Sequence, residues 1–193
     1  TIRHYHDHPA YIQALADSVL QHWSINGRPE KLVMSFHGVP KMHLLKGDPY
    51  HCECMKTGRL LAEKLGLSKE EYTVAFQSRF GRQEWLKPYL ANTLEALGKT
   101  KTKRIDLICP GFSSDCLETL EEIAMEGQEI FHEHGGKEYR YIPCLNDDTN
   151  FISALHTIAL EHMHGWSTAL ESPVVLELRN QRAQAAEAAI TAG

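Results

Sequence analysis

Residues 32–36 read LVMSF, and residues 37–40, which read HGVP, follow them directly. A short apolar run bounded by Gly and Pro predicts a buried β-strand that ends in a sharply turned loop. Upstream, Pro9 at the first position of a helix opens an amphipathic pattern that continues to about Ser24. Downstream, residues 52–65 predict a second helix, which Gly66 ends. A strand between two helices is the repeating unit of an α/β fold.

The same unit recurs along the chain. Further strands are predicted at residues 72–76, 104–109 and 139–142, and further helices at residues 85–97, 115–134 and 150–164. Strands joined by right-handed helical crossovers form one open, four-stranded parallel sheet flanked by helices, so the predicted fold class is α/β. We expect one domain over residues 1–166, with residues 1–25 as its opening helix. Residues 167–193 are rich in Ala and Gln and predict a weakly anchored tail with helical tendency.

Composition excludes several classes of function. The net charge is −5, so a general nucleic-acid binder, which needs a basic surplus, is not expected. No run of 18 apolar residues and no signal-peptide pattern occur, which predicts a cytoplasmic protein. The five cysteines form no CxxC pair, and their odd number favours free thiols in a reducing compartment. Their individual roles stay open: Cys52, Cys54, Cys109, Cys116 and Cys144.

Ligands of open α/β folds bind beyond the carboxyl ends of the strands. The four loops at this edge carry His37, then residues 77–79 (QSR), residues 112–118, and residues 146–148 (NDD). A neutral imidazole at a strand end can act as a base or a metal ligand. The alternative is a histidine that only bonds to nearby backbone.

Three glutamates recur at a spacing of four residues in the helix predicted over residues 115–134. Glu118, Glu122 and Glu126 therefore form a column on one helix face. Such a column suits a divalent cation that prefers oxygen ligands. The predicted buried side consists of four apolar residues: Leu117, Leu120, Ala124 and Phe131. A regular helix turns the glutamates away from that side, so periodicity alone favours a solvated acidic face.

Two further groups of residues could bind a ligand or a metal. Gln77 and Ser78 place polar donors near Trp85, which suits a planar ligand, although a tryptophan in the core explains Trp85 equally well. His4, His6 and His8 alternate near the start of the chain and could bind a metal, but incidental surface histidines are the favoured interpretation. Cys52 and Cys54 lack the spacing of a zinc knuckle.

Five motifs, taken together and in order, resemble one family. They are residues 35–40 (SFHGVP), 46–50 (KGDPY), 77–81 (QSRFG), 110–115 (PGFSSD) and 117–122 (LETLEE). In this arrangement the chain resembles the ferrochelatases from its first residues nearly to Trp166. The resemblance implies the C-terminal half of a bacterial-type enzyme, that is, one half of the two-domain chelatase fold.

The resemblance also implies an activity. Ferrochelatases are metal-inserting lyases that place ferrous iron in protoporphyrin IX to form protohaem, the last step of haem biosynthesis. The implied partners are protoporphyrin IX, ferrous iron and the missing N-terminal half of the same enzyme, with peripheral membrane contact of the whole enzyme. Iron is a substrate, so no cofactor is expected. No [2Fe-2S] cluster is expected either, because the tail has no cysteine.

By resemblance, His37 and Glu118 are the catalytic residues, and the metal path consists of His37, Glu118, Glu122 and Glu126. The substrate-binding residues are Tyr50, Gln77, Ser78 and Trp85. Family helices carry a widened turn that would aim Glu118 and Glu122 inward. Which of His37 and Glu118 takes protons stays open. Alternatives are a cobalt chelatase of the same fold, or a non-catalytic half domain that binds porphyrin or metal.

Overall fold

The computed structural model describes residues 1–166 and 169–191. The chain divides into two compact units, Thr1–His162 and Met163–Gly193. The first unit contains the sheet and carries all the predicted site residues. The second contains α8 (Pro173–Thr191), whose described side chains are exposed. Among the described residues, no helix combines the length and the apolar character that crossing a bilayer requires.

The first unit is built on one parallel sheet. Its strands are β1 (Lys31–His37), β2 (Tyr72–Gln77), β3 (Arg104–Ile108) and β4 (Glu138–Tyr141). They lie in the order β2-β1-β3-β4, and every neighbouring pair is parallel. The predicted α/β fold with an open four-stranded sheet is therefore confirmed. β2 lies on one side of β1, whereas β3 and β4 lie on the other side. The strand order therefore reverses between β1 and β3. The carboxyl ends of these strands form a topological switch point, where ligands of such folds bind.

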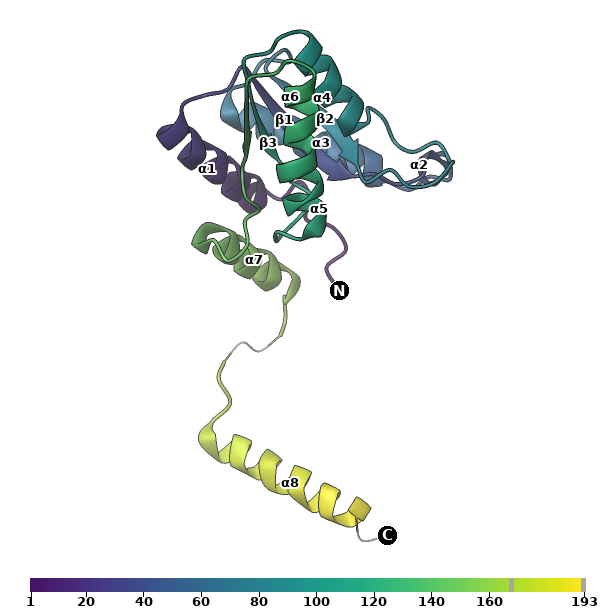
Figure 1. Ribbon diagram of the computed structural model, residues 1–193. Coiled ribbons are helices and arrows are strands. Elements are labelled where there is room, and N and C mark those ends of the chain that lie inside the picture. The colour runs from purple at the N-terminus through teal and green to yellow at the C-terminus, as the bar shows by residue number, and fades with distance from the viewer. Residues whose placement is uncertain (167–168, 192–193) are drawn as a thin grey trace. The chain divides into compact units, whose positions relative to one another are not determined.

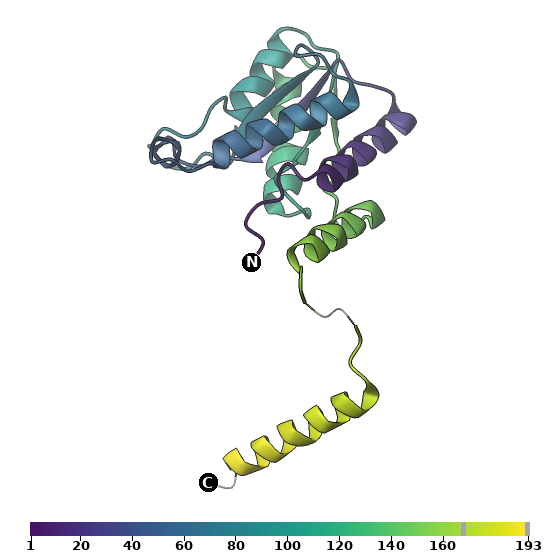
Figure 2. The same cartoon turned by 180° about the vertical axis from the view of Figure 1, so that it is seen from behind.

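Helices cover both faces of the sheet. α1 (Pro9–Asn26) and α3 (Tyr50–Leu65) lie on one face, whereas α4 (Leu90–Lys99) and α6 (Gly127–Glu133) lie on the other (Figures 1 and 2). α7 (Thr149–His162) packs against α1. The apolar residues of β1 alternate between two clusters: Leu32, Met34 and Phe36 join the cluster that contains α1 and α3, and Val33 joins the cluster that contains α4.

This alternation positions the end of β1. Successive side chains of a strand point to opposite faces, so Ser35 and His37 follow Val33 on the side of α4 and α6. The buried Ser35 hydroxyl donates to Oε1 of Gln77, which lies opposite His37 in the register of β1 and β2. The strand pattern alone therefore directs His37 toward the glutamate-bearing segment.

Two predicted element boundaries were wrong. The loop predicted over residues 38–50 contains a short helix, α2 (Lys41–Leu45). The helix expected from residue 85 begins only at Leu90, because Trp85 and Tyr89 form isolated bridges to residues 40 and 76 and the chain bends between them. Pro88 explains this difference: proline lacks an N–H donor and disfavours helical geometry in the residue before it.

The helix predicted over residues 115–134 is divided. It consists of α5 (Leu117–Leu120), a π-helical turn η1 (Glu122–Glu126) and α6. Within it, the N–H of Glu126 reaches back five residues to the carbonyl of Glu121, at 3.0 Å. This is the widened turn that the family resemblance implies.

The π turn changes which side of the helix is buried. The prediction placed Leu117 and Leu120 inside, but both are exposed, and the structure buries Thr119 and Ile123 instead. Hydrogen bonds near both ends of the π turn explain why Thr119 and Ile123 are buried. The Thr119 hydroxyl hydrogen-bonds with Asp115, at 3.1 Å, and the Tyr139 hydroxyl of β4 donates to the Ile123 carbonyl, at 2.6 Å.

A buried ion pair within β3 is hydrogen-bonded to the C-terminal part of α1. The Asp106 carboxylate is completely buried and accepts hydrogen bonds from Trp23 Nε1 at 2.9 Å and from Arg104 Nε at 3.0 Å. Arg104 also donates to the carbonyls of Asn26, at 2.5 Å, and Gly27, at 2.7 Å, where α1 ends. One guanidinium thus neutralises the buried charge and satisfies the last carbonyls of the helix.

Candidate active site

His37 lies where β1 ends, at the switch point of the sheet. Its side chain is half-buried, and its Nδ1 lies 2.6 Å from the Gly38 carbonyl oxygen. A carbonyl oxygen can only accept, so Nδ1 carries a proton, and in the neutral imidazole Nε2 keeps its lone pair. The Tyr50 hydroxyl donates to the His37 carbonyl at 2.9 Å and so fixes the backbone of this loop.

Gly38 is required directly after His37. A Cβ at this position would lie 2.7 Å from the Gln77 carbonyl oxygen and 3.1 Å from Trp85. Only glycine allows the loop after β1 to approach the end of β2 so closely. The HGVP segment therefore brings His37 and the QSR loop together.

Aromatic rings flank His37. The ring centroids of Trp85 and Phe112 lie 6.5 Å and 6.4 Å from the imidazole centroid, and both side chains are half-buried. Trp85 is one of the predicted substrate-binding residues. Phe112 was not predicted individually, although its position in the loop after the third strand, among small and polar residues, is a usable signal.

Gln77 is buried and connects the elements of the site. Its side-chain nitrogen donates to the Glu118 carbonyl at 2.7 Å and to the Glu122 carboxylate at 3.2 Å. Since its oxygen accepts from Ser35, the amide is saturated by protein groups. Gln77 therefore links β1 and β2 to the glutamate-bearing segment.

Ser78 holds Glu122 in place. Its backbone N–H donates to one carboxylate oxygen at 2.6 Å, and its hydroxyl donates to the other at 2.5 Å. Ser78 has a φ of +61°, a left-handed conformation that is uncommon for a residue other than glycine. This backbone conformation points the N–H toward Glu122, so the carboxylate turns toward the sheet edge rather than into bulk solvent.

Glu118 is exposed and lies within the electrostatic reach of His37. The pKa of its carboxyl lies below the usual value, first because the Cys116 thiol and the N–H of Glu118 itself hydrogen-bond to it. Positive charge on His37 lowers this pKa further. Both residues adjoin Gln77, which lies opposite His37 in the sheet register and donates to the Glu118 carbonyl.

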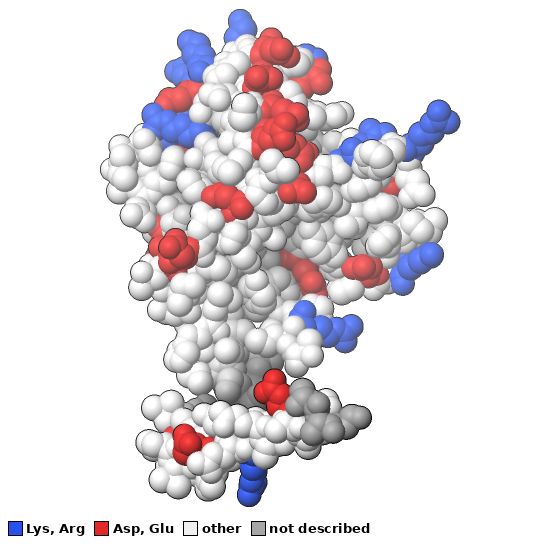
Figure 3. Space-filling view, turned by 60° about the horizontal axis from the view of Figure 1, so that its bottom comes forward, with Lys and Arg blue, Asp and Glu red and all other residues white. Residues whose placement is uncertain are grey.

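The three predicted glutamates do not share one environment. Glu122 and Glu126 line a cavity of about 260 Å³ together with Gln77, Ser78 and Tyr89, whereas Glu118 lies outside it. A row of acidic side chains follows the segment that α5, η1 and α6 form (Figure 3). Carboxylates thus extend from the His37 end of the sheet along this helix.

A second polar network anchors the loop before Glu118. The Asp115 carboxylate accepts from the Tyr141 hydroxyl at 2.6 Å and from the Asn146 side-chain amide at 2.8 Å. These hydrogen bonds join the loops that follow β3 and β4. Sequence reasoning did not connect Asp115 with Tyr141 or Asn146, because these two partners lie 26 and 31 residues away.

Buried cysteines do not supply thiolates to this site. All five cysteines are free. Burial raises the pKa of Cys54 and Cys144 to about 12 and raises that of Cys109 well above the usual value. These three thiols therefore stay protonated near neutral pH, which agrees with a structural role.

Comparison with known proteins shows which family the chain is similar to. A family model of ferrochelatases matches residues 1–163. The ferrochelatase of Chromobacterium violaceum is 63% identical over 167 residues, which cover 86% of this chain and 46% of the relative. The ferrochelatase of Herminiimonas arsenicoxydans is 58% identical over 183 residues, which cover 95% of this chain and 50% of the relative. The ferrochelatase of Methylobacillus flagellatus is 59% identical over 168 residues, which cover 87% of this chain and 49% of the relative. The chain spans about half the length of the curated relatives it matches, and it belongs to the ferrochelatase family.

Proposed function

We propose that this chain supplies the catalytic half of a ferrochelatase, which inserts ferrous iron into protoporphyrin IX and forms protohaem. The observation that supports this function is the position of His37 at the switch point between the rings of Trp85 and Phe112, with the Glu118 segment bonded to Gln77 on the neighbouring strand. An imidazole, a carboxylate and flat aromatic walls are the groups that metallation of a planar macrocycle needs.

The reaction explains these residue types. Insertion of Fe²⁺ releases two pyrrole N–H protons, so bases must lie near the ring centre. Nε2 of His37 can accept a proton because Nδ1–H faces the Gly38 carbonyl. The Glu118 carboxylate, which its hydrogen bonds keep ionised, can hold the incoming cation or accept the second proton. Glu122 and Glu126 extend this set of oxygen ligands as the path of the metal.

Substrate contact and positioning fall to different residues. We assign contact with the macrocycle to Trp85, whose ring lies beside His37 and is partly accessible. Tyr50, Gln77 and Ser78 were predicted to bind substrate, but their polar groups bond to His37, Glu118 and Glu122. In this proposal they act mainly by holding the catalytic groups in place.

The remaining requirements concern the whole enzyme. The N-terminal half of the same protein would complete the porphyrin cleft, and peripheral membrane contact would deliver the apolar substrate. Ferrous iron is a substrate, so the proposal includes no cofactor, and the tail has no cysteine to hold a [2Fe-2S] cluster. The free cysteines support a cytoplasmic location.

The test of this function is turnover with a soluble porphyrin. The complete protein that contains this half is incubated with Fe²⁺, Zn²⁺ or Co²⁺ and the porphyrin, and metalloporphyrin absorption bands are followed. Catalytic formation with Fe²⁺ supports a ferrochelatase, whereas a preference for Co²⁺ and a more acidic tetrapyrrole would identify the cobalt chelatase. A spectral shift that stops at one equivalent would identify a porphyrin carrier and refute the enzyme.

Glu118→Gln should lower kcat of the complete enzyme by about 100-fold, since it removes the charge but preserves the size of the side chain. The rate of metalloporphyrin formation measures this effect. Glu121→Gln is the matched control, because Glu121 is an exposed carboxylate three residues further along the same segment. Equal rates for the two variants would remove Glu118 from the catalytic groups.

Glu122→Ala should have a smaller effect, seen mainly as a roughly 10-fold increase in KM for the metal. Loss of this carboxylate removes one oxygen ligand from the metal path and leaves Ser78 without its acceptor. Steady-state rates at varied metal concentration separate KM from kcat. Glu129→Ala, in an exposed residue of α6, should behave as wild type. An unchanged KM for Glu122→Ala would exclude Glu122 from the metal path.

A further inference from the structure

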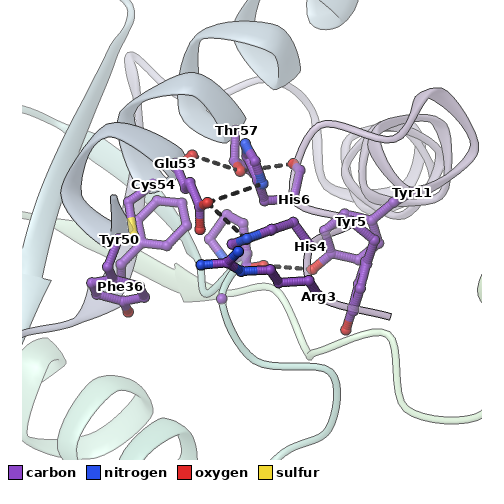
Figure 4. A pocket seen from close by; sticks show the side chains of 12 residues that line it. Arg3, His4, Tyr5, His6, Tyr11, Phe36, Tyr50, Glu53, Cys54 and Thr57 are labelled. Atoms are coloured by element: carbon purple, nitrogen blue, oxygen red, sulfur yellow. Dashed lines mark hydrogen bonds and ion pairs between the residues drawn. The ribbon is translucent and has the colours of Figure 1, made fainter. Parts of the chain in front are cut away.

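A second group of metal-ligating side chains lies outside the His37 site. His4 and His6 precede α1, and Glu53 lies in the first turn of α3. All three line a cavity of about 200 Å³ that also contacts Tyr50 and Phe36 (Figure 4). One ligand atom from each of the three residues lies within 4.8 Å of the other two.

The separations suit coordination of one ion. Glu53 Oε1 lies 2.8 Å from His4 Nδ1 and 4.0 Å from His6 Nδ1. An ion with bonds of about 2.1 Å holds neighbouring ligand atoms roughly 3 to 3.5 Å apart. The two observed distances bracket this range, so adjustment of side-chain torsions alone could close the site.

One of these atoms has no partner. His6 Nδ1 is buried and makes no hydrogen bond in the structure. An unpaired buried nitrogen is destabilising unless something satisfies it. His4 Nδ1 already contacts the Glu53 carboxylate. His6 Nδ1 faces the same carboxylate from beyond hydrogen-bond distance. A cation between them would satisfy all three.

A side-chain hydroxyl of α3 holds the two ligand-bearing segments together. The Thr57 hydroxyl is buried and lies 2.8 Å from the His6 carbonyl and 3.0 Å from the Glu53 carbonyl (Figure 4). Residues 47 positions apart are thereby tied at one point. This link means that the cluster does not depend on the chance positions of surface side chains.

We propose that His4, His6 and Glu53 form a binding site for a divalent first-row transition-metal ion. Two imidazoles and one carboxylate suit Zn²⁺, Fe²⁺ or Co²⁺, whereas Mg²⁺ and Ca²⁺ prefer a shell of oxygen ligands. Three protein ligands leave coordination positions open, which water can fill from the adjoining cavity. The site is separate from the His37 and Glu118 pair, and the inference does not rest on the proposed function.

The test is titration with Co²⁺, whose visible d–d absorption reports ligand number and type. The protein used is the His37→Ala, Glu118→Gln double variant, so that the proposed catalytic site cannot supply the signal. We expect one equivalent of Co²⁺ to bind and Zn²⁺ to displace it. Replacing a ligand, in His6→Gln or Glu53→Gln, should weaken binding by about 100-fold or more, since loss of even a supporting partner costs 10- to 100-fold.

Two matched variants make the result specific. His156→Gln removes an exposed histidine of α7 and should leave Co²⁺ affinity unchanged. Arg3 lines the same cavity, and Arg3→Gln should strengthen binding because it removes a like charge. Unchanged Co²⁺ affinity in both His6→Gln and Glu53→Gln would overturn the proposal, as would the absence of stoichiometric binding in a folded double variant. Absence of metalloporphyrin formation by the complete enzyme with native His37 and Glu118, while the double variant still binds Co²⁺, would count only against the proposed function.

Discussion

Replacing His37 by Ala should reduce metal insertion by the complete enzyme by about 1,000-fold or more while leaving the fold intact. General base catalysis typically contributes 10²- to 10⁴-fold, and His37 is the only imidazole that the proposal places at the ring centre. The initial rate of metalloporphyrin formation with Zn²⁺ and a soluble porphyrin measures the change. Circular dichroism and thermal unfolding test whether the variant retains its fold.

His43→Ala is the matched control for this experiment. His43 lies in α2, six residues beyond His37, and its side chain is exposed. The His43→Ala substitution removes an imidazole from the same part of the chain but leaves the residues of the candidate active site unchanged. A His37→Ala enzyme that retained a near-normal rate would refute the assignment of His37 and, with it, the proposed mechanism.

The second large effect concerns stability. Arg104→Ala should lower the free energy of unfolding by about 3 to 5 kcal/mol, because it leaves the Asp106 carboxylate buried without its cationic partner. Asp106 is completely buried, and the Arg104 side chain is 12% exposed, so solvent can replace little of the lost interaction. Asp106 has two other polar neighbours: Trp23 Nε1 donates one hydrogen bond to its carboxylate, and His22 Nε2 lies 3.6 Å from it.

Chemical denaturation followed by circular dichroism measures this change in the chain. Arg59→Ala is the control, since Arg59 forms an exposed pair with Glu63 in α3 and should change stability by less than about 1 kcal/mol. The double variant Arg104→Met with Asp106→Leu should recover much of the loss, because it removes both charges. If Arg104→Ala and Arg59→Ala destabilised the chain equally, the buried pair would not be the stabilising element we infer.

The extent to which the sequence predicts this site depends on the range of the interactions. His37 was identified because it follows a short apolar strand and precedes Gly38 and Pro40, which are local signals of a turn at a strand end. Glu118 was found differently, by resemblance of its motif to a family, because helical periodicity alone favoured a solvated acidic face. Glu53 was not connected with His4 or His6, because α1 and α3 must pack before their residues meet.

The glutamate-bearing helix shows why local periodicity was insufficient. A regular helix would bury Leu117 and Leu120, and the prediction followed that rule. The structure inserts a π turn, in which the Tyr139 hydroxyl of β4 binds the Ile123 carbonyl. Gly127 permits this approach, since a Cβ there would lie 2.7 Å from that hydroxyl. The decisive partner is 16 residues away, beyond any helical repeat.

The amino-acid sequence by itself determined the α/β class, the four strands and the loops that carry His37 and Glu118, because periods of two and 3.6 residues and breaks at Gly and Pro are local properties. Tertiary packing alone decided the direction of Glu122, the link through Gln77 and the meeting of His6 with Glu53. Each of these depends on a hydrogen bond or contact between elements distant in the chain, and such contacts exist only after the sheet and its helices have assembled.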